Sequence, residues 1–241
     1  MNNIKMKIKH NCSKQDVYHY NLDIHKKKLV FQNFGNVSGR NKDYCFIKPS
    51  GLVANQITLN SIVSVSLKNL EYFNKNNFKP SSDTPTHVRL YNYFDEIGGI
   101  VHTHSTYATA WCQAGRAIPC FGTTHADYWA GDIFVTRKLS NEEIETNYED
   151  NIGKVIIEKL ESENISPFDC PGILVHGHGP FSWGKNISDA VKHAELLEFI
   201  SKEAYLSVTL NKDIKPISKV LKEKHFLRKH GSEAYYGQEI E

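Results

Sequence analysis

The chain has 241 residues, which is enough for one large domain or two small ones with a sizeable core. Hydrophobic residues make up 40% and charged residues 23%, the balance of an ordinary globular protein. Lys and Arg number 29 against 27 acidic residues, so the net charge of +2 gives no reason to expect a nucleic acid or a membrane surface as partner.

The compartment follows from two further features. No apolar run approaches the length of a membrane span, and the N-terminus lacks the apolar core of a signal peptide, so a cytoplasmic protein is expected. The 5 cysteines are scattered and include no C-x-x-C pair, so we expect reduced, mostly buried thiols. Because no repeat or interdomain linker is present, we predict a single domain over residues 1–241.

The N-terminal part is the least informative. Residues 1 to about 30 are rich in Lys, Asn and His with loosely spaced apolar positions, so a short helix there stays open. Residues 34–39 contain Gly and Asn, which both accept positive φ, and predict a turn.

A strand predicted at residues 45–48 runs into the turn Pro49-Ser50-Gly51. The N–H groups and hydroxyl of such a turn, with Lys48 beside them, would suit a phosphate. Most such triplets are simply turns, so both interpretations stay open. Residues 62–66 alternate with period two and predict a half-buried strand.

A helix is predicted to begin at Pro85 and to run to residue 94, because proline favours the first helical turn. Its N-terminus would favour an anion beside Ser81 and Ser82. Asp83 could be a plain N-cap, or it could cap and still present an oxygen to a metal.

The stretch from Gly98 to Ser105, GGIVHTHS, has the pattern of a strand that leaves a core and enters a cleft. Side chains alternate along a strand, so His102 and His104 would share one face and could converge on a metal ion. The alternative is a pair of partly exposed histidines at a strand end.

Residues 107–115 predict a short helix that ends at a glycine. Residues 121–129 have no clear period and predict a loop, in which Asp127 is either solvated or a proton carrier. One helix is expected from Asn141 to Leu160, with acidic residues in its first turn.

A second buried strand, residues 171–175, runs into His176-Gly177-His178. Residues 188–210 predict a long amphipathic helix. The basic stretch at residues 222–230 is typical of a solvated helix face, and the tyrosines that follow it are more typical of packing than of catalysis.

Alternating histidines after two strands suggest a metal site. The side chains that could converge are Asp83, His102, His104 and His178. One oxygen and three nitrogens suit zinc and would also accept manganese, iron or cobalt. Near a phosphate-binding turn, such an ion indicates a phosphorylated hydroxyketone substrate, whose carbonyl it would polarise toward an enediolate. Asp127 and Tyr236 are the candidate acid and base.

Several long blocks together resemble the class II aldolase/epimerase family, and within it the epimerases. They are residues 48–51, 81–87, 98–105, 122–128, 175–183, 227–231 and 235–238. The similarity extends over most of the chain from about residue 34, but not over the first thirty residues or residues 40–44.

The resemblance implies a three-layer αβα sandwich on a largely antiparallel sheet, assembled as a fourfold-symmetric homotetramer with sites between subunits. It implies one zinc per subunit, held by Asp83, His102, His104 and His178, with His176 as a neighbour. It also implies substrate contacts from Gly35, Asn36, Ser50, Gly51, Ser81 and Ser82. Asp127 and Tyr236 match the family's proton carriers, which act on the metal site of an adjoining subunit. Lys48, Thr123, Glu149 and His225 also fall in matching blocks.

The implied activity is the interconversion of L-ribulose 5-phosphate and D-xylulose 5-phosphate by cleavage and re-formation of the C3–C4 bond. Two alternatives remain: a class II aldolase acting, for example, on L-fuculose 1-phosphate, and a non-enzymatic binding module on the same fold. Aldolases of the family usually have Glu where this chain has Asp83, which favours the epimerase. The pathway, arabinose or ascorbate-type pentose catabolism, is left open.

Overall fold

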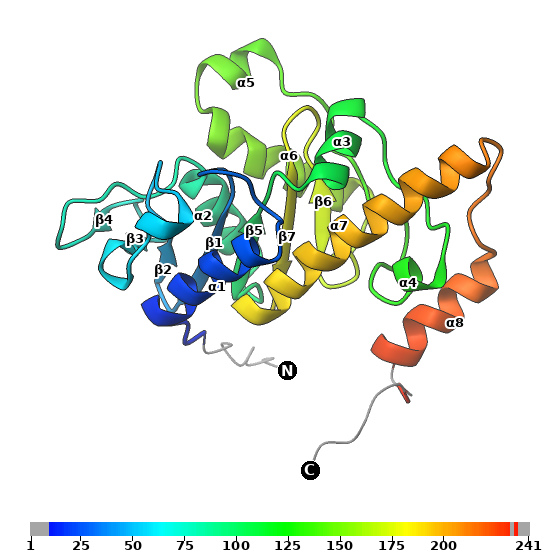
Figure 1. Ribbon diagram of the computed structural model, residues 1–241, viewed down its shortest axis with the longest axis horizontal. Coiled ribbons are helices and arrows are strands. Elements are labelled where there is room, and N and C mark those ends of the chain that lie inside the picture. Colours follow the sequence, from blue (N-terminus) through cyan, green and yellow to red (C-terminus); the bar gives the residue numbers. More distant parts are fainter. Residues whose placement is uncertain (1–9, 232–233, 236–241) are drawn as a thin grey trace, which may run out of the picture.

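A seven-stranded antiparallel sheet organises the chain, in the strand order β4-β3-β2-β1-β5-β7-β6 (Figure 1). The computed structural model describes residues 10–231 and 234–235. The strands are β1 (Asn36–Asn41), β2 (Tyr44–Ile47), β3 (Val63–Ser66), β4 (Tyr72–Phe73), β5 (Gly99–His102), β6 (Gly172–Leu174) and β7 (Pro180–Gly184). Each neighbouring pair is antiparallel, so the largely antiparallel sheet expected from the resemblance is confirmed.

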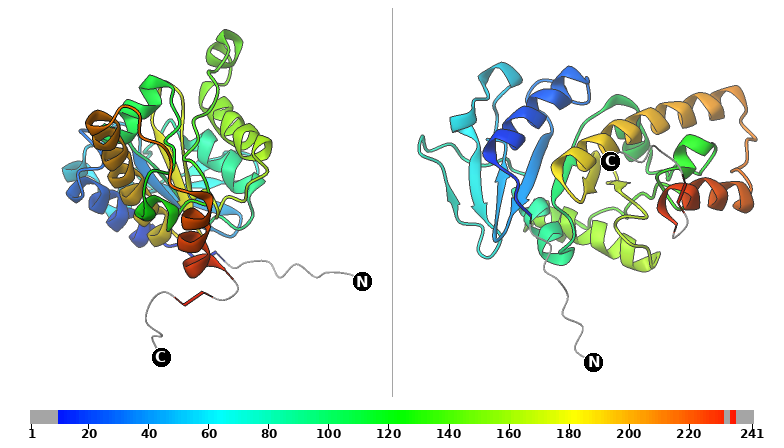
Figure 2. Two further views of the ribbon diagram at one scale, coloured as in Figure 1. Left: turned by 90° about the vertical axis from the view of Figure 1, so that its right-hand side faces the viewer. Right: turned by 90° about the horizontal axis from the view of Figure 1, so that it is seen from below.

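Helices cover both faces of this sheet. They are α1 (Lys14–Lys26), α2 (Thr84–Tyr93), α3 (Thr106–Ala114), α4 (Thr123–Ala126), α5 (Asn141–Glu145), α6 (Tyr148–Ser162), α7 (Ile187–Leu210) and α8 (Lys219–His230), with short 3-10 helices η1 (Ala54–Gln56) and η2 (Leu59–Ser61). Figure 2 shows α1 and α7 on one side of the sheet and α2 and α6 on the other. This is the predicted αβα sandwich.

The side chains of β5 point alternately into the two core clusters on either side of the sheet. Ile100 packs in one core cluster with Leu90 of α2 and Ile156 of α6. Val101, the next residue, packs in a second cluster with residues of α1 and α7, such as Val191. Successive residues of a strand point to opposite faces of the sheet, so β5 is buried on both sides. Its last residue is His102.

The turn predicted at residues 34–39 is wrong, because β1 begins at Asn36 and lies in the middle of the sheet. Within this stretch, Gly35 has the positive φ that was expected, +75°. The Ser38 hydroxyl lies 2.7 Å from His87 Nδ1 and 2.8 Å from the Tyr91 hydroxyl. Tertiary hydrogen bonds of this kind let polar residues occupy a central strand, which local preferences do not reveal.

The single helix predicted from residue 141 to residue 160 is wrong as well. It breaks at Asn147, whose φ of −125° and ψ of 61° are not helical. No residue of α5 is buried, whereas α6 buries an apolar face. Burial of this face stabilises α6, whereas α5 buries no residue and projects from the body (Figure 2).

The remaining elements follow the expectations closely, with additions. The Pro85 helix, the 107–115 helix, the strand at 62–66 and the long helix at 188–210 appear as α2, α3, β3 and α7. The predicted loop at 121–129 contains the short helix α4, and β7 was not anticipated. The N-terminal helix left open exists as α1, where Ser13 and Asp16 form a capping box.

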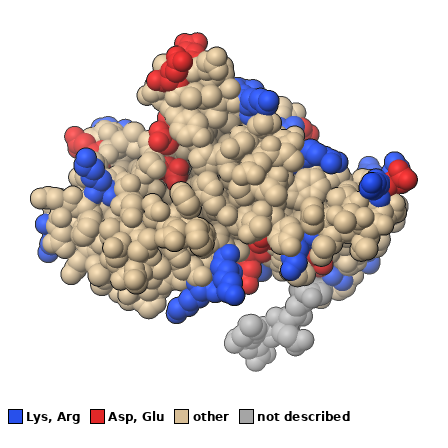
Figure 3. Space-filling view, turned by 45° about the horizontal axis from the view of Figure 1, so that its top comes forward, with Lys and Arg blue, Asp and Glu red and all other residues tan. Residues whose placement is uncertain are grey.

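The cysteines, the apolar character of the helices and the surface charges can be compared with the expectations from the sequence. All five cysteines are free, and all but Cys12 are buried. Within the described residues, no helix combines the length and the apolar character that crossing a bilayer requires. On the face shown in Figure 3, charges of both signs are interspersed, and acidic side chains gather on the projecting α5.

Candidate metal centre

Three histidines from two sheet connections meet at one point. His102 is the last residue of β5, His104 lies just beyond it, and His178 lies in the turn between β6 and β7. His102 Nε2 lies 3.1 Å from His104 Nε2 and 3.1 Å from His178 Nε2. Because β5 and β7 are neighbours in the sheet, the antiparallel pairing brings the two histidine motifs together.

The protonation of this cluster suits a metal ion. His102 Nδ1 lies 3.0 Å from the Pro180 carbonyl, which can only accept, so Nδ1 carries the proton and Nε2 has a lone pair. Burial lowers the pKa of His102, His104 and His178 below the ordinary value, which keeps all three rings neutral. The donor atoms lie within 4.8 Å of one another. Three neutral imidazoles converging in this way fit a divalent ion.

Asp83 lies beside this cluster. It precedes α2 without making a side-chain cap, and its Oδ2 instead accepts a 2.6 Å hydrogen bond from Asn36 Nδ2. Burial of Asp83 opposes its ionisation, but the neighbouring imidazoles of His102, His87 and His178 and the hydrogen bond from Asn36 outweigh this effect, so the Asp83 pKa is lowered. Among the described residues, the compact donor cluster contains the three histidines and not Asp83. Its role as a ligand therefore stays a prediction.

Second-sphere contacts surround the cluster. The Tyr148 hydroxyl, at the start of α6, lies 2.8 Å from His178 Nδ1. The buried atoms Asn36 Oδ1 and His87 Nε2 belong to side chains that interact with Asp83, and neither atom has a hydrogen-bond partner among residues 10–231 and 234–235. Groups of this kind are typical of a site completed by a ligand. Sequence analysis missed Tyr148, since no motif marks a residue at a helix start as the partner of a distant histidine.

The residues predicted to hold a phosphate lie side by side. Ser81 N donates to the Lys48 carbonyl at 2.9 Å, and Ser50 N donates to the Lys79 carbonyl at 3.0 Å. Gly51 has φ +74° and open space where a side chain would stand. Ser82, which follows Ser81 in the second turn, is exposed. The two turns thus form one polar rim, and Asn36 connects this rim to Asp83 by donating hydrogen bonds to both Ser81 and Asp83.

Lys48 and Gly35 lie in the chain beside the first rim turn and beside Asn36, respectively, and tertiary contacts fix both. Lys48 Nζ donates to the Asn33 carbonyl at 2.8 Å, and burial lowers the Lys48 pKa to about 8. A Cβ on Gly35 would collide with the Val30 side chain and the His102 carbonyl. Gly35 therefore allows the strand carrying His102 to approach closely.

Asp127, one of the two predicted proton carriers, is not part of the histidine cluster. Asp127 directly follows α4, and its carboxylate is bound by His225 and Arg228 of α8. Within the described chain, the hydrogen bonds of the Asp127 carboxylate go to α8 and none reaches the histidine cluster. Tyr236 lies outside the described residues. The basic α8, predicted as a merely solvated face, therefore has a specific contact with Asp127.

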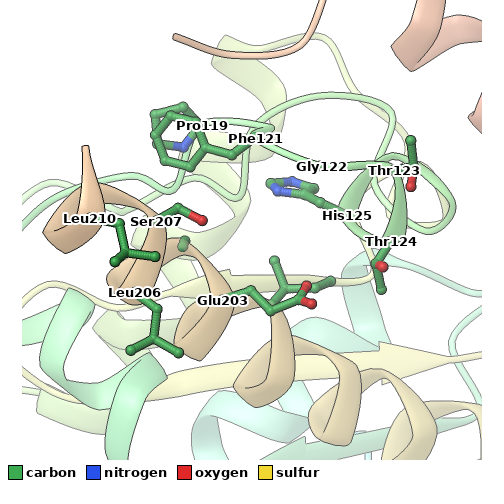
Figure 4. A pocket seen from close by; sticks show the side chains of 12 residues that line it. Pro119, Phe121, Gly122, Thr123, Thr124, His125, Glu203, Leu206, Ser207 and Leu210 are labelled. Atoms are coloured by element: carbon green, nitrogen blue, oxygen red, sulfur yellow. The ribbon is translucent and has the colours of Figure 1, made fainter. Parts of the chain in front are cut away.

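Other residues in matching blocks have varied surroundings. His176 packs against Gly115, where a Cβ would meet its ring, and stays out of the metal cluster. The Glu149 carbonyl accepts a hydrogen bond from the Thr86 hydroxyl. Thr123 lines a cavity of about 420 Å³ between the α4 region and the second half of α7, shown in Figure 4. None of the three clustered histidines lines that cavity.

Comparison with known proteins identifies the family. The model of the class II aldolase and adducin N-terminal domain matches residues 15–205. The chain belongs to this family. It is 47% identical over 227 residues to the L-ribulose-5-phosphate 4-epimerase UlaF of Salmonella paratyphi C, covering 93% of this chain and 98% of that protein. The UlaF protein of Salmonella typhi matches to the same extent.

Solved structures of the class II aldolase family share the fold. An L-fuculose 1-phosphate aldolase superposes with a TM-score of 0.74 at 21% identity, covering 90% of this chain and 96% of that one. The L-fuculose 1-phosphate aldolase of Glaciozyma antarctica gives 0.71 at 17% identity, covering 88% and 79%. At these identities the similarity establishes the αβα architecture alone.

Proposed function

We propose that this protein is a metal-dependent epimerase that interconverts L-ribulose 5-phosphate and D-xylulose 5-phosphate. The observation that carries the proposal is the convergence of three neutral imidazoles beside a polar rim suited to a phosphate. The relatives named for this reaction are 47% identical over 93% of the chain, which supports the same chemistry here.

The metal would be held by His102, His104 and His178, with Asp83 as a fourth ligand, and zinc suits this donor set best. When bound, a divalent ion polarises a carbonyl and stabilises the negative charge left by C3–C4 cleavage. Manganese, cobalt or iron would serve in the same way.

The chain's own residues handle the fragments and the proton. The rim of Ser50, Gly51, Ser81 and Ser82 would keep the phosphate end of the two-carbon fragment bound while its carbonyl turns its other face. Asp127 and Tyr236 would act from opposite faces, one removing the C4 hydroxyl proton and the other returning it. Two-sided proton transfer is what epimerisation requires and a one-sided aldol cleavage does not.

Asp127 would serve the metal site of an adjoining subunit. Its hydrogen bonds to α8 support this arrangement, since they hold it away from the cluster of its own chain. We propose a cytoplasmic homotetramer with one metal per subunit and a single domain over residues 1–241. Exposed apolar residues on α8, such as Val220 and Leu227, are consistent with a covered surface.

The deciding experiment incubates the purified protein with L-ribulose 5-phosphate and detects D-xylulose 5-phosphate by a coupled assay, with and without chelator. Conversion that is lost on chelation and restored by zinc is expected, with about one divalent ion per chain by metal analysis. Accumulation of free glycolaldehyde phosphate would indicate an aldolase instead. Absence of both bound metal and turnover would indicate a binding module.

A further inference from the structure

Asp127 is held by a cluster of side chains from one face of α8. Arg228 Nη2 lies 3.0 Å from Oδ1 and 2.9 Å from Oδ2, and Arg228 Nε lies 3.2 Å from Oδ1. His225 Nδ1 lies 3.0 Å from Oδ1, and Lys229 Nζ lies 3.4 Å from Oδ2. The spacing of three and four residues places all of these side chains on the same side of the helix.

The backbone reinforces this contact. His230 Nε2 lies 2.9 Å from the Asp127 carbonyl, so α8 binds both the side chain and the main chain of this residue. Figures 1 and 2 both show α8 beside α4. The Asp127 side chain is 12% exposed and that of Arg228 is 22% exposed. An ion pair shielded to this extent is stronger than an ordinary surface pair.

Arg228 differs from the other partners of Asp127. It is the partner that contacts both carboxylate oxygens, and its planar guanidinium fixes the rotation of the carboxylate. Lys229 supplies a point charge at one oxygen, and His225 is charged only when protonated. Within the described part of the chain, the charged or titratable side chains in contact with the Asp127 carboxylate are these three.

We infer that Arg228 is a positioning residue for Asp127, orienting its carboxylate and keeping it ionised for proton transfer. The inference rests on the proposed function, because it concerns the proton carrier of that reaction. A proton carrier must be aimed at the reacting atom, and a displacement of about 1 Å costs roughly 100-fold in rate. Burial alone would favour the protonated carboxyl, but the hydrogen bonds from Arg228 and His225 outweigh it, and the Asp127 pKa is lowered.

The test compares three variants as intact holoenzymes. R228Q removes the charge and the two-oxygen contact, whereas R228K keeps the charge and loses the planar geometry. R89Q is the matched control, since Arg89 of α2 forms the same kind of two-point pair with Asp150 of α6, and neither residue is among those proposed to bind metal or substrate. For each variant, kcat and KM are measured from pH 4 to pH 9, together with Tm.

R228Q is expected to lose roughly 10- to 100-fold in kcat with little change in KM, and the acidic limb of its kcat profile should move to higher pH. R228K should lose turnover while its acidic limb moves less. R89Q should lower Tm without changing the kcat profile. A kcat profile for R228Q that matches that of R89Q would overturn the inference and leave Arg228 a structural role.

Failure of the inference can be separated from failure of the proposed function. A wild-type protein that binds metal but has no epimerase activity would refute the function. The Arg228–Asp127 pairing would then be tested by Tm alone. The change in Tm caused by R228Q is measured once in the wild-type protein and once in the D127N variant. If the Tm loss caused by R228Q is unchanged when Asp127 is already replaced, the two side chains are not coupled and the inference fails independently.

Discussion

The hydroxyl of Tyr148 provides the most direct test of the metal centre, because its removal leaves the clustered histidines in place. Tyr148→Phe deletes one oxygen, which lies 2.8 Å from His178 Nδ1. The hydroxyl can accept from a protonated Nδ1 or donate to a bare one, so it steadies the ring in either tautomer. A metal requires His178 to present a lone pair with its ring correctly turned.

The expected loss of zinc affinity can be estimated from the contact that is removed and from the exposure of Tyr148. Loss of an outer partner of a metal-bound imidazole typically lowers metal affinity 10- to 100-fold, which corresponds to about 1.4–2.8 kcal/mol. Tyr148 is partly exposed, so water can replace part of the contact, and we expect roughly a tenfold loss. The free energy of unfolding of the metal-free protein should fall by no more than about 1 kcal/mol.

The assay is zinc binding measured by competition with a chromophoric chelator, with kcat measured at saturating zinc. Tyr205→Phe, on the exposed side of α7, is the control, since Tyr205 is 50% exposed and belongs to no predicted site. If Tyr148→Phe binds zinc within twofold of the wild type, the hydroxyl does not orient His178, and the argument from this contact is refuted.

Three further expectations follow from the site. Asp127→Asn should lower kcat roughly 100- to 10,000-fold with unchanged metal content, and unchanged turnover would remove Asp127 from the mechanism. Competitive inhibition by sulfate should weaken as the pH rises through about 8. Burial lowers the pKa of Lys48 to about 8, so this side chain loses its positive charge in that range. The variant Lys48→Met should show no such pH dependence. Gly35→Ala should lower the free energy of unfolding by more than about 1 kcal/mol in urea titrations. Gly35 has φ +75°, and the Cβ of an alanine there would collide with the His102 carbonyl. An unchanged urea midpoint would contradict this expectation.

Lys48 should also affect stability with pH, in a definite direction. Its folded pKa of about 8 lies below the ordinary value of 10.5, so between these values the unfolded chain binds more protons than the folded one. The contribution of Lys48 to stability therefore rises as the pH increases from about 8 to 10.5. Urea midpoints of wild type and Lys48→Met should converge over this window, and a constant difference would contradict the assignment.

Local periodicity sufficed for the elements that bury one clear face. The residues around Leu90 and those around Leu197 repeat with helical spacing, and both segments are helices in the structure. The same reasoning failed at Asn36 and Ser38, whose polar side chains lie in a central strand because distant residues satisfy them. It also failed at Asn147, where the backbone is not helical and α6, which buries an apolar face, begins separately from α5, which buries no residue.

From the sequence alone came the family, the strand that leads to His102 and the residue types of a metal site, because closely spaced ligands and long blocks of matching residues are visible without a fold. His104, expected on the same strand as His102, lies just beyond the end of β5. Only the tertiary structure decided that His178 reaches His102, that Tyr148 supports His178, and that Arg228 holds Asp127. These contacts join residues 30 to 101 positions apart. They depend on the pairing of strands and the docking of helices, and no local pattern encodes which distant side chains those events bring into contact.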